Sequence, residues 1–227
     1  MEHIQKRVAN GKKGLKMAND YSLEEYYKSN QTPWTDPDDA LVEAFNNLEI
    51  RTGKAIDIGA GEGGNSFWLA KKGLDVISID LAPSAVNFIN SEAAKRNYNI
   101  HAKVGNIFNY ESNEKFDLAL LSYVHLPKNE RQILFNKLIK LLKDDGVFIY
   151  LGFLKDENSV PQGSSPEEFP SSMQVAEELN GLTVFQILEQ LDVRRIIPIG
   201  HQHGSFEGIT TKVIAKKGSM SCERETF

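Results

Sequence analysis

The stretch of sequence that decides the fold reads Ala55-Ile56-Asp57-Ile58-Gly59-Ala60-Gly61-Glu62-Gly63-Gly64-Asn65-Ser66. It opens as an apolar run, expected to be a buried strand over 55–59, and it leads into an amphipathic segment over 64–72, expected to be a helix. Four glycines join the two. Glycine allows a tight turn and lets a ligand approach the backbone, because no Cβ stands in the way. A plain flexible turn would not need so many, so the stretch predicts a nucleotide-binding site.

The alternation of strand and helix continues beyond this turn. Strands are expected at 75–80, 102–104, 116–122 and 147–153, and helices at 84–96 and 130–143. Their apolar runs are continuous, as parallel strands covered on both faces require. After Pro170 the pattern predicts a helix near 173–179, a strand over 182–188, and a hairpin of 194–199 with 209–215. The fold class is therefore α/β: a Rossmann-like, doubly wound mixed sheet of seven strands, with helices on both faces and a C-terminal antiparallel hairpin.

The chain divides into three unequal parts. Residues 1–19 carry five cationic side chains against one acidic one and are expected to be a basic, flexible leader. Residues 20–218 form one domain, with lid-like helices over 20–50, and 219–227 form a polar tail. Within the domain, the proline-containing stretch 155–170 is too long for a simple connector and is expected to line a site.

Composition narrows the class of partner. The net charge of −5 argues against nucleic acid, and no apolar run reaches the roughly 18 residues of a membrane span. The single cysteine, Cys222, cannot form an internal disulfide, which fits a cytoplasmic location. A small-molecule substrate is the expectation.

The glycine spacing fits two nucleotides. Gly59, Gly61 and Gly64 match the dinucleotide pattern, whereas Gly59, Gly61 and Gly63 after Asp57 match the pattern typical of S-adenosylmethionine (SAM) enzymes. A carboxylate beside the turn suits a ligand with an ammonium group and would repel a pyrophosphate. No tyrosine is followed four residues later by lysine, the pair that short-chain reductases use. SAM is therefore favoured, with a nicotinamide-dependent oxidoreductase as the alternative.

Motifs over residues 55–153 resemble those of class I SAM-dependent methyltransferases. Within that class the chain is similar to the group that joins tellurite-resistance, thiopurine and related small-molecule methyltransferases. The likeness rests on Gly64-Asn65-Ser66 with Leu69-Ala70 and Gly73, on Leu141-Leu142-Lys143-Asp144-Asp145-Gly146, and on Thr32-Pro33-Trp34. It implies methyl transfer from SAM to an oxygen, nitrogen or sulfur of a small molecule, with S-adenosylhomocysteine (SAH) as product.

By that resemblance, the backbone at Gly59–Gly61 flanks the methionine moiety, with Asp57 close to its amino group. Asp80 takes the ribose, although it could instead cap the helix that begins at Pro83. Leu81 packs on the adenine, whose edge meets Gly105-Asn106-Ile107, and Asn106 stands where the family commonly has Asp. The cofactor residues expected in all are Trp34, Asp57, Gly59, Ala60, Gly61, Asn65, Asp80, Leu81, Gly105, Asn106, Ile107 and Ser122.

His125 is the candidate catalytic residue, because it follows the fourth strand near the carboxyl edge where ligands bind in parallel sheets. There it could accept a proton from the acceptor, or it could merely pack beside the cofactor. The segment lacks the Asp/Asn-Pro-Pro-aromatic pattern of amino-group DNA methyltransferases. Nucleic acid is again disfavoured as a substrate.

Four residues are expected to line the substrate pocket: Tyr26, Tyr27, His201 and His203. The tyrosines, with Tyr21 and Trp34, could close as a lid over the sulfonium or belong to the ordinary core. The two histidines, near Glu207, could bind metal, border the pocket or lie in a solvated turn. No metal is expected. A non-catalytic SAM-binding module and an RNA or protein methyltransferase that uses the basic leader remain as further alternatives.

Overall fold

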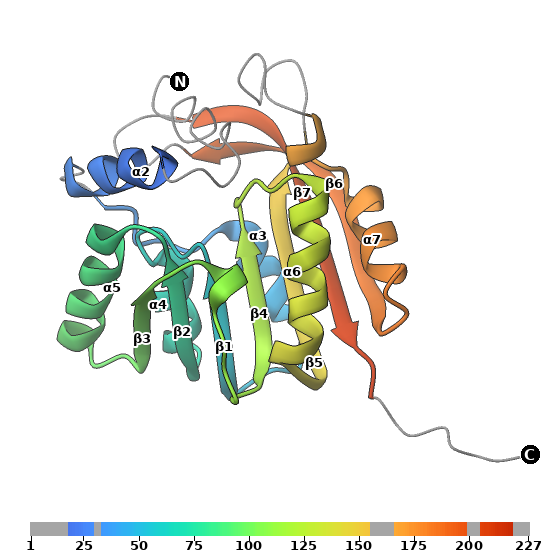
Figure 1. Ribbon diagram of the computed structural model, residues 1–227, viewed down its shortest axis with the longest axis horizontal. Coiled ribbons are helices and arrows are strands. Elements are labelled where there is room, and N and C mark those ends of the chain that lie inside the picture. The colour runs from blue at the N-terminus through green and yellow to red at the C-terminus, as the bar shows by residue number, and fades with distance from the viewer. Residues whose placement is uncertain (1–17, 30–32, 155–165, 199–204, 220–227) are drawn as a thin grey trace, which may run out of the picture.

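A seven-stranded mixed sheet runs through the protein in the order β3-β2-β1-β4-β5-β7-β6 (Figure 1). The computed structural model describes residues 18–29, 33–154, 166–198 and 205–219. The strands are β1 (Gly53–Ile58), β2 (Leu74–Asp80), β3 (Ile100–Val104), β4 (Phe116–Ser122), β5 (Leu142–Phe153), β6 (Phe185–Pro198) and β7 (Ser205–Lys217). β1 to β5 are parallel, and β7 is antiparallel to both β5 and β6. The Rossmann-like α/β fold with its C-terminal hairpin is confirmed.

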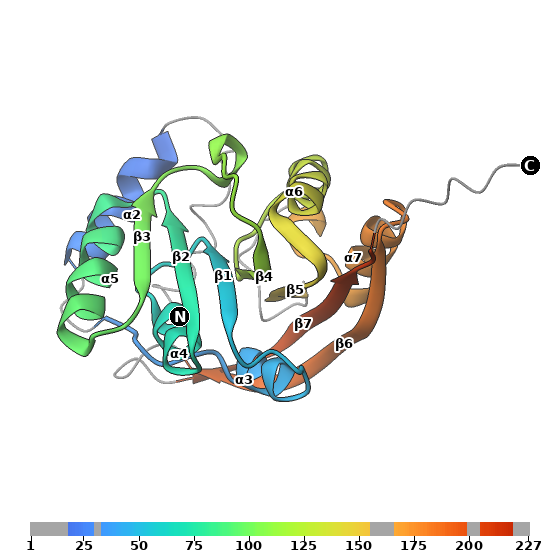
Figure 2. The same cartoon turned by 90° about the horizontal axis from the view of Figure 1, so that it is seen from below.

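Helices cover both faces of this sheet (Figure 2). They are α2 (Ala18–Ser29), α3 (Asp39–Asn46), α4 (Gly64–Lys71), α5 (Pro83–Arg96), α6 (Lys128–Leu141) and α7 (Ser172–Asn180), with 3₁₀ turns η1 (Ile107–Asn109) and η2 (Pro166–Glu168). Buried side chains of α3, α4 and α5 share one core cluster, and those of α6 and α7 share the other. β4 explains why the strand sequences read as unbroken apolar runs. Its Leu118 and Leu120 join the first cluster, while Ala119 and Leu121 join the second.

Two boundaries predicted from the sequence are wrong. The stretches 182–188 and 194–199 were expected as separate strands, but the structure has the single strand β6 over Phe185–Pro198, with a register shift between Ile187 and Glu189. The intervening stretch contains the polar residues Glu189, Gln190 and Asp192, which an edge strand accommodates because its side chains can face water. The helix expected over 130–143 ends at Leu141, and β5 begins at Leu142 instead of residue 147. A register shift in the β4–β5 ladder and the positive φ of Asp145 (64°) let the strand start early.

Several predictions fall on residues outside the described ranges. They include nearly all of the leader over 1–19, the tail over 219–227, and most of the loop over 155–170. His201 and His203 also lie outside the described residues. The division into leader, domain and tail therefore stays a prediction. No helix within the described ranges has the length and apolar character needed to cross a membrane.

Candidate cofactor and acceptor site

The glycine turn between β1 and α4 is built from left-handed backbone. Gly59, Gly61 and Gly63 have φ values of 71°, 56° and 82°, a region that side chains with a Cβ rarely adopt. Space is also restricted, because a Cβ on Gly59 would stand 2.3 Å from Cγ2 of Val124. The amides of Gly59 and Ala60 both donate to the carbonyl of Ile79, at 2.8 and 3.1 Å, which fixes the turn to β2. Glycine is required here by conformation and by packing together.

Asp57 supports this turn from within the protein. Its side chain is 1% exposed, and its Oδ2 accepts a hydrogen bond from Oγ of Ser66 at 2.6 Å. Ser66 in turn lies 2.7 Å from the hydroxyl of Ser78, so the network joins β1, α4 and β2. Burial raises the pKa of Asp57 to about 6, the Ser66 hydrogen bond opposes that rise, and the nearby Asp80 adds to it. Asp57 thus braces the first turn of α4.

Asp80 ties the turn to the carboxyl end of β2. Its Oδ2 accepts from the amide of Gly61 at 2.8 Å, and its Oδ1 accepts from the amide of Ala82 at 2.9 Å. Asp80 is 8% exposed, so a small part of it remains accessible. The carboxylate therefore has a structural role beside any role in binding a ribose.

An apolar shelf follows at the ends of β2 and β3. Leu81 is 36% exposed and Val104 is 53% exposed, so both present apolar surface to solvent at this edge of the sheet. A Cβ on Gly105 would meet nothing within 4 Å, so the protein itself leaves open space there. Asn106 uses its Oδ1 to cap η1, accepting from the amide of Phe108 at 2.9 Å. Ile107 is buried in the core, so only its backbone is available to a ligand.

Residues 33–38, named here the strap, lie against the glycine turn. The backbone amide of Trp34 donates to Oε2 of Glu62 at 2.8 Å, and the amide of Asp38 donates to Oδ1 of Asn65 at 2.9 Å. The approach is close, since a Cβ on Gly64 would be 2.2 Å from the carbonyl oxygen of Asp36. Of the two residues expected at the cofactor, Trp34 therefore bonds the glycine turn through Glu62, and Asn65 holds the other end of the strap through Asp38.

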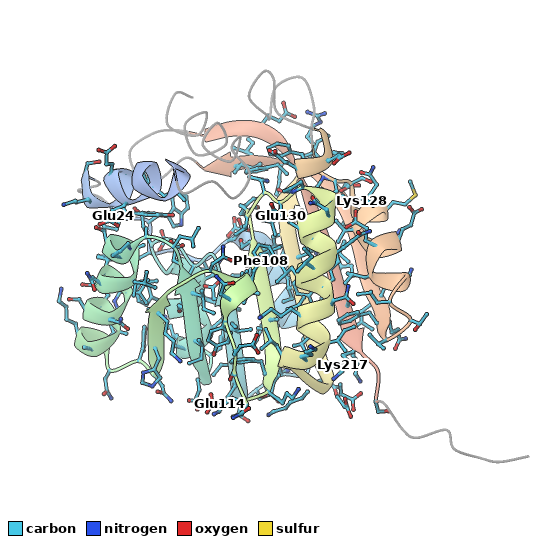
Figure 3. The ribbon with its side chains drawn as sticks, viewed as in Figure 1. Glu24, Phe108, Glu114, Lys128, Glu130 and Lys217 are labelled. Atoms are coloured by element: carbon cyan, nitrogen blue, oxygen red, sulfur yellow. The ribbon has the colours of Figure 1, made fainter. Side chains whose placement is uncertain are left out.

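Helix α2 lies above the carboxyl edge, over the start of α5 (Figures 1 and 3). Glu24 accepts from the amide and the hydroxyl of Ser84, at 2.8 and 2.5 Å, and so caps α5 from another helix. These hydrogen bonds lower the pKa of Glu24. The rings of Tyr26 and Tyr27 are half-buried and meet edge to face, with centroids 5.2 Å apart. The pair thus belongs to the helix that lies above the carboxyl edge of the strands.

The end of β4 combines strain with an unsatisfied polar atom. Tyr123 has φ of 55°, a left-handed conformation that is costly for a bulky residue. Just before it, the hydroxyl of Ser122 is buried and has no hydrogen-bond partner among the described residues. Such an atom normally requires a partner, and here a ligand could supply one. Tyr123 also lies beside the carboxyl of Asp38, whose pKa is raised by burial against the opposing hydrogen bonds of Tyr123 and Ala40.

His125 lies in a group of aromatic rings at the same edge. Its ring is tilted against that of Phe169, with centroids 4.4 Å apart, and stacks on Phe153 at 5.8 Å. The ring of Tyr123 is tilted against that of Phe153, with centroids 4.5 Å apart. Ile197 of β6 belongs to the same hydrophobic cluster as Phe153 and Phe169. The hairpin thus bends over the ends of β4 and β5 (Figure 1). No group of three possible metal ligands occurs within the described parts of the chain.

These features fit SAM as a ligand. The shelf offers apolar surface to an adenine, the space beside Gly105 is not filled by the protein, and the hydroxyl of Ser122 needs a partner. Three features of the site carry no clear sequence signal: the conformation of Tyr123, the Glu24 cap and the aromatic cluster. Glu62, which bonds the strap, does carry a sequence signal. It is the only charged residue within Gly59–Gly64 and could have been predicted to have a role.

A family model described as a methyltransferase domain matches residues 51–199, more than half of the chain. The chain belongs to the class I SAM-dependent methyltransferases. SAM is the cofactor of that family, and the prediction of a SAM enzyme over a nicotinamide-dependent one is confirmed.

Individual relatives agree with this family. Over 91 residues, 40% of this chain, the methyltransferase is 30% identical to TehB of Haemophilus influenzae, a probable SAM-dependent methyltransferase. That stretch covers 31% of TehB, so the chain spans under a third of the relative's length. The crystal structure of TehB superposes with a TM-score of 0.66 at 19% identity, over 86% of this chain and 67% of that one.

Two further solved structures share the fold. The N-methyltransferase NodS of Bradyrhizobium japonicum WM9, in complex with SAH, has a TM-score of 0.62 at 17% identity, over 87% of this chain and 98% of NodS. A structure concerned with converting a disulfide bond into a thioacetal group during echinomycin biosynthesis has a TM-score of 0.72 at 16% identity, over 89% and 93% of the two chains.

Proposed function

We propose that this methyltransferase moves the methyl group of SAM to an oxygen, nitrogen or sulfur of a small molecule. One observation supports the proposal above all others. The left-handed glycine turn, Asp80 and the exposed shelf of Leu81 and Val104 follow one another along the carboxyl ends of β1 to β3. The polar turn, the carboxylate and the apolar surface lie in the same spatial order as the methionine, ribose and adenine parts of SAM.

The expected cofactor residues take somewhat different parts in this proposal. Gly59, Ala60 and Gly61 border the methionine moiety, and Ser122 offers its unpartnered hydroxyl to it. Asp80 accepts from the ribose hydroxyls, and Gly105 with the backbone at Asn106 and Ile107 borders the adenine. Asp57, Asn65 and Trp34 act one layer behind, because their polar groups already bond Ser66, the strap or the turn.

The acceptor would bind beside His125, at the ends of β4 and β5. SAM supplies a methyl group on a positively charged sulfur, which is already a good leaving group. The protein then has to orient the acceptor, exclude water and remove one proton. His125 is placed to receive that proton, and its contacts with Phe153 and Phe169 hold the ring at the edge of the site.

The covered edge favours a small acceptor over a polymer. The strap contacts the glycine turn, α2 lies over the start of α5, and Ile197 of the hairpin packs onto the aromatic cluster. A polymer would need an open groove across the same edge. The apolar and aromatic surround suits a thiol or a planar ring.

The proposal is tested in two steps on the full chain. Calorimetry measures SAM and SAH affinity for the wild type and for Asp80→Ala, which we expect to bind about ten- to a hundred-fold more weakly, a loss of about 1.5–3 kcal/mol. Mass spectrometry then follows methyl transfer to dithiothreitol, catechol and benzylamine, one probe for each acceptor atom. We expect His125→Ala to lower turnover about 10²–10⁴-fold with SAM affinity nearly intact.

His101→Ala is the matched control, because His101 is exposed on the edge strand β3. Unchanged SAM affinity in a folded Asp80→Ala variant would reject the cofactor site. A loss of turnover below threefold in His125→Ala would reject the proton-accepting role. SAM binding without transfer to any probe would favour a binding module, and steeply salt-dependent RNA binding would favour a polymer substrate.

A further inference from the structure

A buried arginine lies behind the acceptor side of the site. Arg131 is in the first turn of α6, whose start is marked by Lys128 and Glu130 in Figure 3, and it is 2% exposed. Its Nε and Nη2 donate to the two carboxylate oxygens of Glu178 on α7, at 3.0 and 2.6 Å. The Glu178 side chain is itself 7% exposed. A guanidinium this deeply buried is uncommon and has to be fully paired.

The remaining nitrogen of Arg131 joins two distant parts of the chain. Nη1 donates to the carbonyl oxygen of Leu126 at 2.7 Å and to that of Glu167. Leu126 directly follows His125, and Glu167 stands two residues before Phe169. One nitrogen therefore holds both the loop that carries the histidine and the segment that carries the ring packed against it.

We infer that Arg131 is a positioning residue for the acceptor half of the site. By bonding both carbonyls, it sets the distance between His125 and Phe169, and so the orientation of the imidazole. The inference rests on the proposed function, in which His125 borders the acceptor. Arg131 itself need not touch substrate, cofactor or the reacting atoms.

The chemistry of the group favours this geometric role over simple stabilisation. A buried ion pair contributes little net stability compared with a well-packed apolar pair, because both charges lose their hydration. What the guanidinium adds is a planar fork that can bond a carboxylate on one edge and two carbonyls on the other. A lysine ammonium has one nitrogen and cannot make these bonds in the same plane.

The contacts of Arg131 also separate the two halves of the site. Its hydrogen-bond partners, Glu178, Leu126 and Glu167, lie on α7, on the loop after β4 and on η2, and none of the three belongs to the glycine turn or the strap. Disturbing Arg131 should therefore change the acceptor side and leave cofactor affinity nearly unchanged.

The test compares Arg131→Lys and Glu178→Gln with the wild type in the full chain. Glu178→Gln keeps the shape of the side chain and one acceptor oxygen, so it serves where the lysine variant does not fold. Arg51→Lys is the matched control, because Nη1 of Arg51 also donates to two carbonyls, those of Leu48 and Ile50, at the opposite end of β1. Proton NMR follows the imidazole of His125, assigned with His125→Gln, calorimetry measures SAH affinity, and transfer to dithiothreitol reports the reaction.

We expect Arg131→Lys to move the His125 ring-proton signals away from positions set by the two phenylalanine rings. Transfer to dithiothreitol should fall about tenfold or more, since a displacement of about 1 Å can cost a hundredfold. SAH affinity should stay within about twofold, a change of roughly 0.4 kcal/mol, and Arg51→Lys should change none of the readouts. Unmoved His125 signals in both folded variants would overturn the inference. Failure of the wild type to bind SAH would instead overturn the proposed function. The two failures are distinguishable, because the NMR comparison of the His125 ring does not require bound SAH.

Discussion

The two halves of the sheet hold the site by different means. Around β1, β2 and β3 the cofactor half is built on one continuous motif, in which β1 leads through the glycine turn directly into α4, and Asp80 bonds that turn across 19 positions. Around β4, β5 and the hairpin, the proposed acceptor half has no such motif and is held by contacts between distant segments, such as Arg131 to Glu178 and His125 to Phe169. The cofactor is common to the family, whereas the acceptor differs. A local motif suits the first, and adjustable packing between distant segments suits the second.

Replacing glycines gives the largest expected effect and tests how local the cofactor half is. Gly59→Ala would place a Cβ against Val124 on left-handed backbone, so we expect a loss of about 2–6 kcal/mol in the free energy of unfolding. Thermal denaturation and SAH calorimetry measure the loss.

Gly105→Ala is the matched substitution, because its Cβ meets nothing in the protein. It should leave stability within about 0.5 kcal/mol of the wild type and weaken SAH binding about tenfold or more, since an added methyl in a packed site costs about 1–3 kcal/mol. A Gly59→Ala protein as stable as the wild type would contradict the claim that the turn requires glycine at this position. Unchanged SAH affinity in Gly105→Ala would place the adenine elsewhere.

Asp57, which is buried behind the glycine turn, should make the stability of the cofactor half depend on pH. Its pKa is raised from 3.8 to about 6 on folding, so the unfolded chain releases the proton first as pH rises. Stability should therefore fall between about pH 4 and pH 6 and stay low above it, by about 3 kcal/mol from this group. Asp57→Asn should remove that loss and be more stable than the wild type at pH 8, but not at pH 4. Chemical denaturation at both pH values measures the difference, and equal stability of the two proteins at pH 8 would reject the assignment.

The smallest effect is expected where α2 meets α5. Glu24→Gln removes the charge that caps α5 at Ser84, while Glu25→Gln changes an exposed neighbour on the same helix. For Glu24→Gln alone, we expect faster hydrogen exchange over residues 18–29. We also expect SAH affinity to fall by about two- to threefold, because one helix cap is weakened. Cofactor should slow that exchange in the wild type if α2 closes over it. Equal exchange in both variants would make α2 an ordinary packed helix.

The correct and incorrect boundaries have different physical origins. The strand, turn and helix over 53–71, the parallel direction of β1 to β5 and the hairpin follow from glycine conformation and apolar runs, which depend on neighbours in the sequence. The break predicted inside β6 is wrong because an edge strand tolerates polar residues, and being at the edge is a property of the whole sheet.

By itself, the sequence determined the α/β class and the glycine turn, because a left-handed turn and a buried parallel strand each restrict the residues that can form them. It also favoured SAM as the cofactor, through the carboxylate of Asp57 beside that turn. Only the tertiary structure decided which distant segments meet around the candidate site. Trp34 meets Glu62 across 28 positions, and Arg131 meets Glu178 across 47. Such pairs obey no spacing rule, since their approach depends on how whole helices pack on the sheet. The strap, the aromatic cluster around His125 and the buried arginine therefore become visible only when the chain is folded.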